Sequence, residues 1–274
     1  MRASLIQIAV EEGESVESRR SRVASLVREQ AGAADLVVLP ELWTTGAFAY
    51  ERFGSEAEPL EGPTYELMAK AASDAGVWLH AGSIPERAPS DGSGTGGGAL
   101  YNTSLVFSPD GERVAAYRKI HRFGFDQGEA VLMSAGEELV TVPLPETTLG
   151  IATCYDLRFP ELFRGLVDAG AGTLVLCAGW PERRREHWTL LARARAVENQ
   201  AFVLACGTAG THAGVPQAGH SIVVDPWGEV LAEAGAGEEV LRVEFDPSRV
   251  ATTREQFPAL KDRVLGLRAP QRRP

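Results

Sequence analysis

Residues 149–161 read LGIATCYDLRFPE, an apolar run that stops at Cys154 and continues into a polar turn. The apolar part predicts a buried strand, and the segment after the turn has the composition of a helix start. In α/β proteins, side chains at the carboxyl ends of strands face the crevice where ligands bind. The stretch therefore predicts an α/β fold with Cys154 presented as a candidate nucleophile.

Two other reactive side chains hold similar positions along the chain. Glu41 follows the apolar run at 36–40, and Lys119 follows the strand-like run at 113–118. A carboxylate, an amine and a thiol brought together at strand ends can cleave an amide bond. A free thiol has a pKa near ~8.5, so Cys154 needs a neighbouring base or cation to become an effective nucleophile.

Each of these groups has an expected role in amide cleavage. Glu41 is expected to take the thiol proton and to return it to the departing amine. Lys119 is expected to stabilise the oxyanion, and its positive charge would favour the thiolate. The backbone N–H of Tyr155, next to the nucleophile, is the expected second oxyanion donor.

Strand-like and helical patterns alternate through the chain. The first half is predicted to hold a strand at 4–10, a helix at 16–31, strands at 36–39 and 77–82 around a helix at 63–75, and a hairpin of strands at 103–107 and 113–117. The second half is predicted to hold helices at 160–169 and 182–200, strands at 173–177 and 202–206, and a strand–turn–strand unit at 221–230. Such near-continuous apolar strands between helices are typical of covered or stacked sheets.

Several finer predictions follow from local composition. The helix at 182–200 is predicted to turn Trp188, Leu191, Ala194 and Val197 to one face. The Gly- and Ser-rich composition of residues 88–98 predicts a flexible loop. Because the three reactive residues come from widely separated segments, one domain over 1–265 is expected, followed by a basic tail at 266–274. The basic residues from Arg254 onward predict a solvated face or, alternatively, a contact with a partner subunit.

Charge and composition exclude several function classes. The 274 residues carry a formal net charge of −10, which argues against binding nucleic acid or an anionic membrane surface. No apolar run approaches ~20 residues, and the N-terminus is typical of a first strand rather than a signal peptide, so a cytoplasmic location is expected. The three cysteines have no Cys-x-x-Cys spacing, which predicts neither a disulfide framework nor a metal site.

Three segments together resemble the signatures of the nitrilase, or carbon–nitrogen hydrolase, superfamily. They are 39–43 (LPELW), 117–121 (YRKIH) and 154–161 (CYDLRFPE), which occur in the family's order. The resemblance extends from the first strand to about residue 265. It implies a four-layer α-β-β-α sandwich that continues across a dimer interface, a homodimer or higher homo-oligomer, and no cofactor or metal.

The same resemblance implies a set of site residues. Glu41, Lys119 and Cys154 correspond to the family's Glu–Lys–Cys triad. Glu129, in the loop after the lysine segment, corresponds to a second glutamate that positions the lysine or the attacking water. Tyr155 and Trp180 are the expected substrate-binding residues.

The residues around Cys154 narrow the predicted substrate to a small linear amide. The form CYDLRFPE is similar to the amidase branch, whereas nitrile-cleaving members carry Cys-Trp-Glu. The segments WP at 180–181, HW at 187–188 and ARAVENQ at 194–200 resemble bacterial ω-amidases, which implies 2-oxoglutaramate-like substrates. A deaminated-glutathione amidase or an N-carbamoyl hydrolase is the alternative. Trp43 and Phe48 are expected at the pocket mouth.

Other interpretations of the same residues stay open at this stage. Arg158 and Arg183 are candidates to meet a substrate carboxylate, although Arg158 is also a candidate for a structural ion pair. A cysteine–histidine hydrolase would use His121 or His187 as its base. Non-enzymatic alternatives are a regulatory or interaction protein and a thiol redox sensor built on Cys154.

Overall fold

The computed structural model describes residues 1–90 and 98–265. Most of the predicted loop at 88–98 and the whole predicted tail at 266–274 therefore lie outside the described residues. No helix among the described residues is long and apolar enough to cross a membrane.

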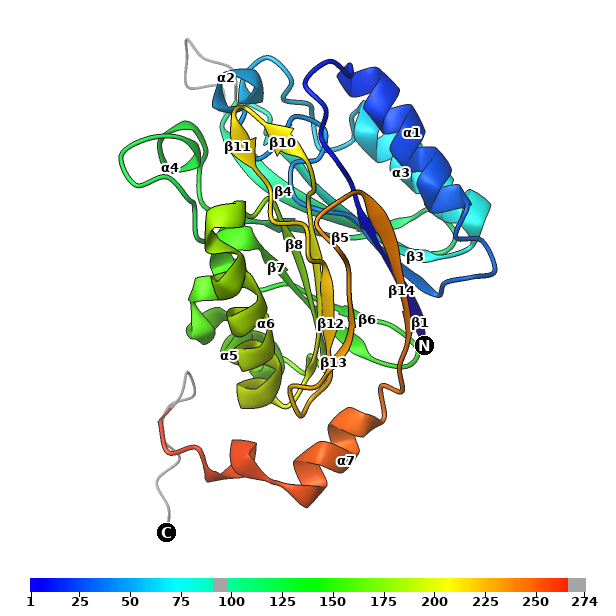
Figure 1. Cartoon of the computed structure of the whole chain (residues 1–274), viewed down its shortest axis with the longest axis vertical. Coiled ribbons are helices and arrows are strands. Elements are labelled where there is room, and N and C mark those ends of the chain that lie inside the picture. Colours follow the sequence, from blue (N-terminus) through cyan, green and yellow to red (C-terminus); the bar gives the residue numbers. More distant parts are fainter. Residues whose placement is uncertain (91–97, 266–274) are drawn as a thin grey trace.

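Two six-stranded sheets form the centre of the fold (Figure 1). The first sheet consists, in spatial order, of β14 (Glu239–Glu244), β1 (Arg2–Gln7), β2 (Leu36–Val38), β3 (Trp78–Arg87), β4 (Leu100–Phe107) and β5 (Arg113–Arg118). The second consists of β13 (Val230–Glu233), β12 (Ile222–Val224), β9 (Phe202–Gly207), β8 (Thr173–Ala178), β7 (Thr148–Thr153) and β6 (Thr141–Pro143). A small hairpin pairs β10 (Thr211–His212) with β11 (Val215–Pro216).

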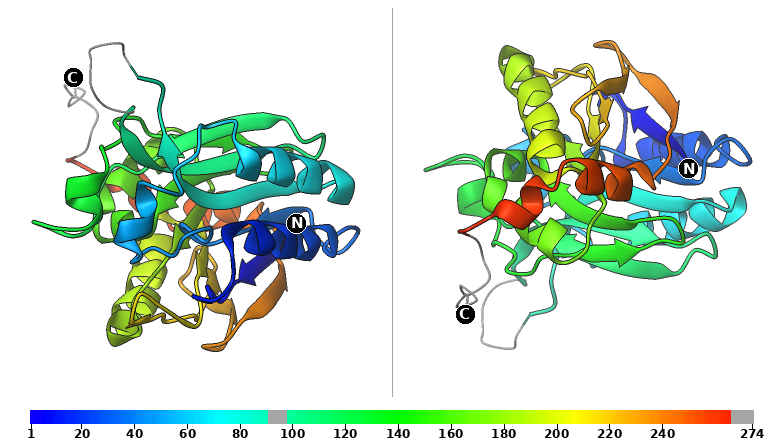
Figure 2. Two further views of the ribbon diagram at one scale, coloured as in Figure 1. Left: turned by 90° about the horizontal axis from the view of Figure 1, so that it is seen from above. Right: turned by 90° about the horizontal axis from the view of Figure 1, so that it is seen from below.

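Helices lie between the strands in sequence and cover the outer faces of the sheets. The α-helices are α1 (Val16–Arg28), α2 (Tyr50–Phe53), α3 (Pro63–Ala75), α4 (Glu129–Leu132), α5 (Pro160–Asp168), α6 (Arg185–Asn199) and α7 (Arg249–Gln256). Short 3-10 helices are η1 (Cys154–Arg158), η2 (Glu182–Arg184) and η3 (Ala259–Asp262). Helices α1 and α3 pack on the first sheet, and α5 and α6 pack on the second (Figures 1 and 2).

Alternation along the strands explains why the sheets stack. In β1, Leu5 joins the core between the two sheets, whereas Ile6 joins the core beneath α1 and α3. The thiol of Cys206 in β9 lies 3.4 Å from the carbonyl oxygen of Val38 in β2, so the sheets are in direct contact. Successive side chains of a strand point to opposite faces, and both faces here are apolar. The result is the α-β-β-α layer order that the family resemblance implies.

The structure departs from the sequence prediction in α6. The predicted face is right for Trp188 and Leu191, which pack against the core, but wrong at Val197, because the buried side chains are Trp188, Ala192, Arg195, Ala196 and Asn199. Val197 is 52% exposed. Ala192, Ala196 and the aliphatic part of the Arg195 side chain form much of the buried face. A pattern based on large apolar residues does not single these residues out.

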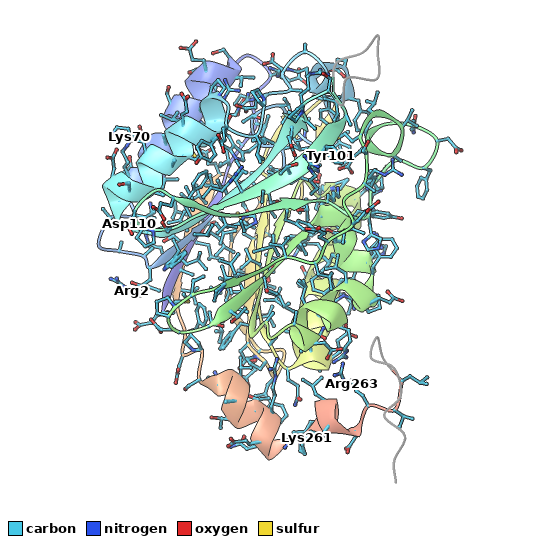
Figure 3. The ribbon with its side chains drawn as sticks, turned by 180° about the vertical axis from the view of Figure 1, so that it is seen from behind. Arg2, Lys70, Tyr101, Asp110, Lys261 and Arg263 are labelled. Carbon is cyan, nitrogen blue, oxygen red and sulfur yellow. The ribbon has the colours of Figure 1, made fainter. Side chains whose placement is uncertain are left out.

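The C-terminal segment after β14 does not present a uniform solvated face. Arg254 is half-buried and donates to the carbonyl oxygens of Gln200, Ala171 and Asn199. Arg263 pairs with Asp168, while Lys261 is exposed at the far end of the molecule (Figure 3). Only part of the predicted solvated run is therefore free in the single chain.

Candidate active site

Four reactive side chains from separate elements meet at one end of the stacked sheets. Glu41 follows β2, Lys119 follows β5, Cys154 begins η1 directly after β7, and Glu129 begins α4. All four are buried and line the same pocket. Tyr155 and Trp180 line the same pocket, so the structure brings together all six residues that the sequence singled out.

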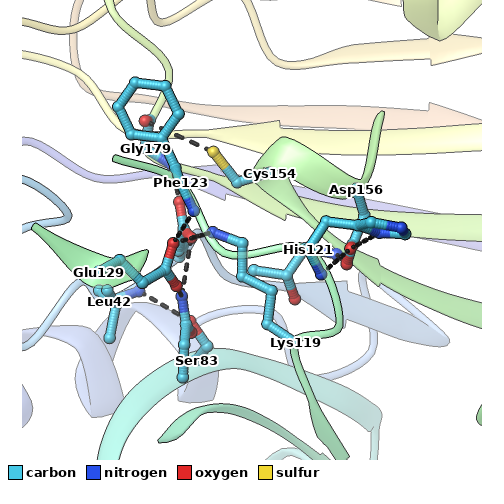
Figure 4. Close-up of polar contacts among 12 residues, drawn as sticks. Leu42, Ser83, Lys119, His121, Phe123, Glu129, Cys154, Asp156 and Gly179 are labelled. Atoms are coloured by element: carbon cyan, nitrogen blue, oxygen red, sulfur yellow. Dashed lines mark hydrogen bonds and ion pairs between the residues drawn. The ribbon is translucent and has the colours of Figure 1, made fainter. Parts of the chain in front are cut away.

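The turn after β7 holds Cys154 in an unusual backbone conformation. Its φ of 47° lies in the left-handed region, where a residue with a Cβ is strained. The carboxylate of Asp156 accepts a 2.9 Å hydrogen bond from the backbone N–H of Thr153, which fixes the turn. The Cys154 thiol points toward the carbonyl oxygen of Gly179 at 3.7 Å (Figure 4).

Lys119 bridges the two buried carboxylates. Its ammonium Nζ lies 2.7 Å from Glu41 Oε1 and 2.7 Å from Glu129 Oε2 (Figure 4). The backbone N–H of Gly179 donates to the other Glu41 oxygen at 2.8 Å, and that of Phe123 donates to Glu129 at 2.8 Å. Each carboxylate is thus held by several donors, as a buried charge requires.

Asn102 in β4 is a site residue that the sequence interpretation missed. Its amide Nδ2 donates to Glu41 Oε1 and to Glu129 Oε1, both at 2.8 Å. Its backbone carbonyl also accepts from the backbone N–H of Lys119 at 2.9 Å. Asn102 therefore contacts every charged member of the cluster.

Electrostatics keep the lysine charged. Burial lowers the pKa of Lys119, but the charges of Glu129 and Glu41 outweigh it and raise that pKa well above its usual value. Burial also raises the pKa of Glu129, with a further rise from Glu41 and an opposing effect from Lys119. The cluster thus holds one cation between two acids, and this excess of negative charge acts on the neighbouring thiol.

The resting cysteine is a thiol. Burial and the negative charge of Glu41 raise the pKa of Cys154 well above its usual value, although Lys119 acts in the opposite direction. The charge of Lys119 does favour the thiolate, as expected, but desolvation and the charge of Glu41 outweigh it in the resting protein. A base must remove the proton when the sulfur attacks, and Glu41 is the acid whose charge acts most on this thiol.

A second buried network ties the lysine segment to the cysteine turn. Asp156 accepts hydrogen bonds from the Tyr117 hydroxyl at 2.7 Å and from the backbone N–H of His121 at 3.0 Å. Its carboxylate also lies 2.8 Å from His121 Nδ1. The His121 side chain is thus directed at Asp156, and its ring stacks on Phe159.

Several other predicted roles change in the structure. No histidine lines the described pocket, which disfavours a cysteine–histidine mechanism. Trp43 is buried in the core, with its indole N–H bonded to the Ala81 carbonyl, so its expected place at the mouth is wrong; Phe48 does line the pocket. Arg184 lines the pocket beside Cys154, whereas Arg183 lines only the outer cavity.

The other two cysteines are packing residues. Cys177 and Cys206 are fully buried, and burial raises the pKa of both thiols, that of Cys177 to about 12. All three cysteines are free, so the chain holds no disulfide. Within the described ranges, no group of three or more His, Cys, Asp or Glu side chains is arranged to hold a metal ion.

Comparison with known proteins adds independent information. Residues 2–255 match the sequence model of the carbon–nitrogen hydrolase family. The chain is 41% identical to a 2-oxoglutaramate amidase of Paenarthrobacter nicotinovorans, over 94% of this chain and 87% of the relative. It is 36% identical to the omega-amidase NIT2 of Mus musculus, over 96% and 94% of the two chains. The crystal structure of Saccharomyces cerevisiae Nit3, a nitrilase-superfamily member, superposes with a TM-score of 0.86 at 32% identity, covering 97% of each chain.

Proposed function

The chain belongs to the carbon–nitrogen hydrolase family and is an amide-hydrolysing enzyme, and from this we propose that Cys154 is its nucleophile and that Glu41, Lys119 and Glu129 complete its catalytic site. The observation that carries the proposal is the buried contact of Lys119 with both glutamates at 2.7 Å, beside the thiol. A buried ion cluster of this kind costs stability unless every charge is paired, and a reactive thiol next to it is typical of a catalytic site.

Acylation begins from the protonated thiol. Glu41 removes the Cys154 proton as sulfur attacks the amide carbon, so a full thiolate need not accumulate. The Lys119 ammonium and the backbone N–H of Tyr155 are the proposed donors to the oxyanion. Glu41 then passes its proton to the departing nitrogen, and the carbon–nitrogen bond breaks. Ammonia is released, and the acyl group stays bound to Cys154 as a thioester.

Deacylation uses the same groups in reverse. Glu41 takes a proton from a water molecule, whose oxygen attacks the thioester carbon. The carbon–sulfur bond breaks, the proton returns to sulfur, and a carboxylic acid leaves. Glu129 acts by holding Lys119, since it accepts from the ammonium at 2.7 Å and from the backbone N–H of Phe123 at 2.8 Å.

For the substrate, we propose a small ω-amide of the 2-oxoglutaramate type. Support comes from two relatives, a 2-oxoglutaramate amidase and an omega-amidase, which align with nearly the whole chain. The pocket has apolar walls formed by Phe48, Phe123 and Trp180, which suits the methylene chain of a short linear amide. The test is ammonia release over 2-oxoglutaramate, deaminated glutathione, glutamine, aliphatic amides, N-carbamoyl amino acids and nitriles, with Cys154→Ala as the inactive control.

The role of Glu41 predicts two opposite effects of one substitution. Glu41→Gln is expected to lower kcat roughly 10²- to 10⁴-fold, because the general base is lost. The same change is expected to shift the pH profile of Cys154 alkylation by iodoacetamide to lower pH, because the charge of Glu41 raises the thiol pKa. A kcat of Glu41→Gln close to that of the wild type would contradict the assignment of Glu41 as the base.

We propose further that the protein is a homodimer. Leu190 and Val197 lie seven residues apart on α6, hence on one face, and are 66% and 52% exposed. The exposed rings of Trp227 and Phe257 lie tilted against each other, with their centroids 6.1 Å apart. An exposed apolar surface of this kind is typical of a subunit interface.

The dimer is tested by light scattering on the wild type and on Leu190→Glu. The wild type is expected at twice the chain mass of 29.4 kDa, and the variant is expected to shift toward the monomer because a charge is placed in the apolar patch. Lys70→Glu, on the exposed face of α3, serves as the charge control. A wild type that runs as a monomer at working concentration contradicts the proposal.

A further inference from the structure

Three arginines gather at the mouth of the pocket. Arg158 ends η1, whose first residue is Cys154, and Arg183 and Arg184 lie in η2, shortly after Trp180 in the loop that follows β8. Arg184 and Arg158 are half-buried and line the same inner pocket as Cys154 and Lys119. Arg183 is exposed and reaches only the wider outer cavity.

These arginines lack the carboxylate partners that arginines elsewhere in the chain have. Arg2, Arg28 and Arg118, for example, each form an ion pair with an Asp or Glu at 2.6–2.9 Å. In the ranges 1–90 and 98–265, neither Arg158, Arg183 nor Arg184 forms an ion pair with a carboxylate, although the chain has an excess of ten acidic residues. The expectation of a structural ion pair for Arg158 is therefore wrong.

The contacts that these guanidinium groups do make hold them in place without neutralising them. Arg184 lies 5.2 Å from the ring centroid of Phe123, and its backbone carbonyl accepts from the Trp180 indole N–H at 2.7 Å. Arg158 lies over the Trp180 ring at 5.1 Å and is 3.2 Å from the His187 ring nitrogen. Aromatic rings stack on a guanidinium plane and leave its N–H edge free to bind an anion.

Mutual repulsion among the three guanidinium groups makes this arrangement unfavourable by itself. Burial lowers the pKa of Arg184, and the charges of Arg183 and Arg158 lower it further. A bound anion would remove both penalties at once. Arginine matches a carboxylate through two parallel hydrogen bonds, and such charge-assisted bonds are stronger than neutral ones.

We propose that Arg184, assisted by Arg158, binds a carboxylate at the far end of the substrate and so selects amides of dicarboxylic acids over neutral amides. This inference rests on the proposed function, because it places the substrate amide at Cys154. Arg184 is the principal contact, since it lines the inner pocket, whereas the guanidinium of Arg158 in that pocket already contacts the His187 ring. The site thus recognises both ends of a short substrate: the amide lies at the Cys154 sulfur, and the carboxylate lies at the arginines.

The test compares two amides that differ at one end. Succinamate carries the carboxylate, and 4-methylpentanamide replaces it with an isopropyl group of similar shape. Arg184→Gln is expected to lower kcat/KM for succinamate roughly 10- to 100-fold, the size expected for a lost hydrogen bond to a charged group. Turnover of 4-methylpentanamide is expected to change less than about 3-fold, since no charged contact is lost there.

Further variants separate recognition from folding. Arg184→Lys keeps the charge but not the paired donors, so its kcat/KM for succinamate is expected between those of wild type and Arg184→Gln. Arg158→Gln is expected to act in the same direction as Arg184→Gln but more weakly. Arg185→Gln, an exposed neighbour outside the pocket, is the matched control and is expected to keep the wild-type preference.

Each outcome has a separate meaning. If Arg184→Gln lowers kcat/KM equally for both amides, or for neither, the carboxylate site is refuted. If the wild type prefers the neutral amide, the carboxylate site is also refuted, while amide hydrolysis at Cys154 stands. If the wild type releases no more ammonia than the Cys154→Ala control from these two amides and from the other amides tested, the proposed function itself is refuted.

Discussion

At the residue scale, Asn102 stabilises the buried negative charge of Glu41 and Glu129. Two buried carboxylates share a single ammonium, so the cluster carries one negative charge more than it can pair internally. The Asn102 amide supplies one N–H to each acid. Hydrogen bonds to an ionised carboxylate favour that form, so Asn102 offsets part of the cost of burying the two acids side by side.

Asn102→Ala is therefore expected to change the pH dependence of the enzyme as well as its rate. Without the Asn102 donor, the pKa of the Glu129 carboxyl, which burial already raises, rises further, and the acidic limb of the kcat/KM profile moves to higher pH. We expect a loss of kcat of roughly tenfold or more, the equivalent of one or two hydrogen bonds to charged groups. The measurement is kcat/KM from about pH 5 to 9 with the substrate that the wild type turns over best.

The matched variant is Asn102→Asp, which is nearly isosteric but adds a third acid. It is expected to move the acidic limb further in the same direction, because like charges raise one another's pKa. A merely structural role for Asn102 would lower kcat in both variants and leave the limb where it is in the wild type.

The residue scale also shows where sequence reasoning works and where it does not. Glu41, Lys119 and Cys154 each follow an apolar run, so local pattern alone marks them. Asn102 sits inside a strand, and its importance depends on the antiparallel register that pairs Thr103 with Arg118. No local signal carries that register, just as none says that Arg184 rather than Arg183 turns inward from η2.

At the element scale, Asp156 aligns the end of β5 with the turn after β7. Its carboxylate accepts hydrogen bonds from the Tyr117 hydroxyl and the backbone N–H of His121 in the lysine segment. It also accepts one from the backbone N–H of Thr153 in the cysteine turn. Lys119 lies between Tyr117 and His121, and Cys154 follows Thr153. The distance between ammonium and thiol thus depends on a carboxylate that touches neither.

Asp156→Asn is expected to weaken this link. An amide can accept fewer of these hydrogen bonds than a carboxylate, and one of its N–H groups would face a donor in a fully buried position. A buried unsatisfied group costs about 1–3 kcal/mol of the free energy of unfolding. Chemical denaturation and kcat measured side by side test this, with Asp126→Asn on the exposed loop as the control.

A preserved kcat with only a fall in stability would assign Asp156 to folding alone. A fall in kcat at a temperature where the variant is fully folded would support alignment of the two strand ends.

Elements with strong local signals were predicted well, and polar ones were not. The helix predicted at 63–75 has those bounds in α3, which begins at a proline and ends at Gly76 in the left-handed conformation. Strand β14 was missed, because its sequence EVLRVE alternates with charges and resembles a surface segment. It becomes a strand because an edge of the first sheet is available to it, which is a tertiary effect.

At the scale of the whole molecule, the stacked sheets bury two histidines that cannot easily be protonated. His80 and His212 are almost completely buried, and burial lowers the pKa of each to about 4. Both ring nitrogens of His212 lack a hydrogen-bond partner among the described residues. The neutral form of each ring is therefore part of the folded state.

We therefore expect the free energy of unfolding to fall at acidic pH because of His80 and His212. A histidine in the unfolded chain has a pKa near ~6.5. Between that value and about 4, the unfolded chain binds protons that the folded chain rejects. The stability contributed by each ring is complete above the unfolded pKa, and is lost as pH falls, by up to about 1.4 kcal/mol per pH unit.

His212→Phe isolates one of these contributions. It keeps the aromatic stacking on Phe48 and removes the titrating group. Urea unfolding at pH 7, 6 and 5 is expected to show a shallower decline in the free energy of unfolding for the variant than for the wild type. Equal slopes would contradict a neutral buried His212, because all other titrating groups are shared.

The order of strands in the first sheet has a consequence for how the protein is made. Strand β1 pairs along its whole length with β14, from Arg2 opposite Glu244 to Gln7 opposite Glu239. On a ribosome, that edge of β1 stays unpaired until residue 244 has left the exit tunnel. At roughly 5–20 residues per second the wait is on the order of 10–50 s, during which an apolar strand offers free N–H and C=O groups to other nascent chains. The pairing that completes the fold thus makes its synthesis a period of aggregation risk, in which a chaperone that covers the N-terminal strand would improve the yield.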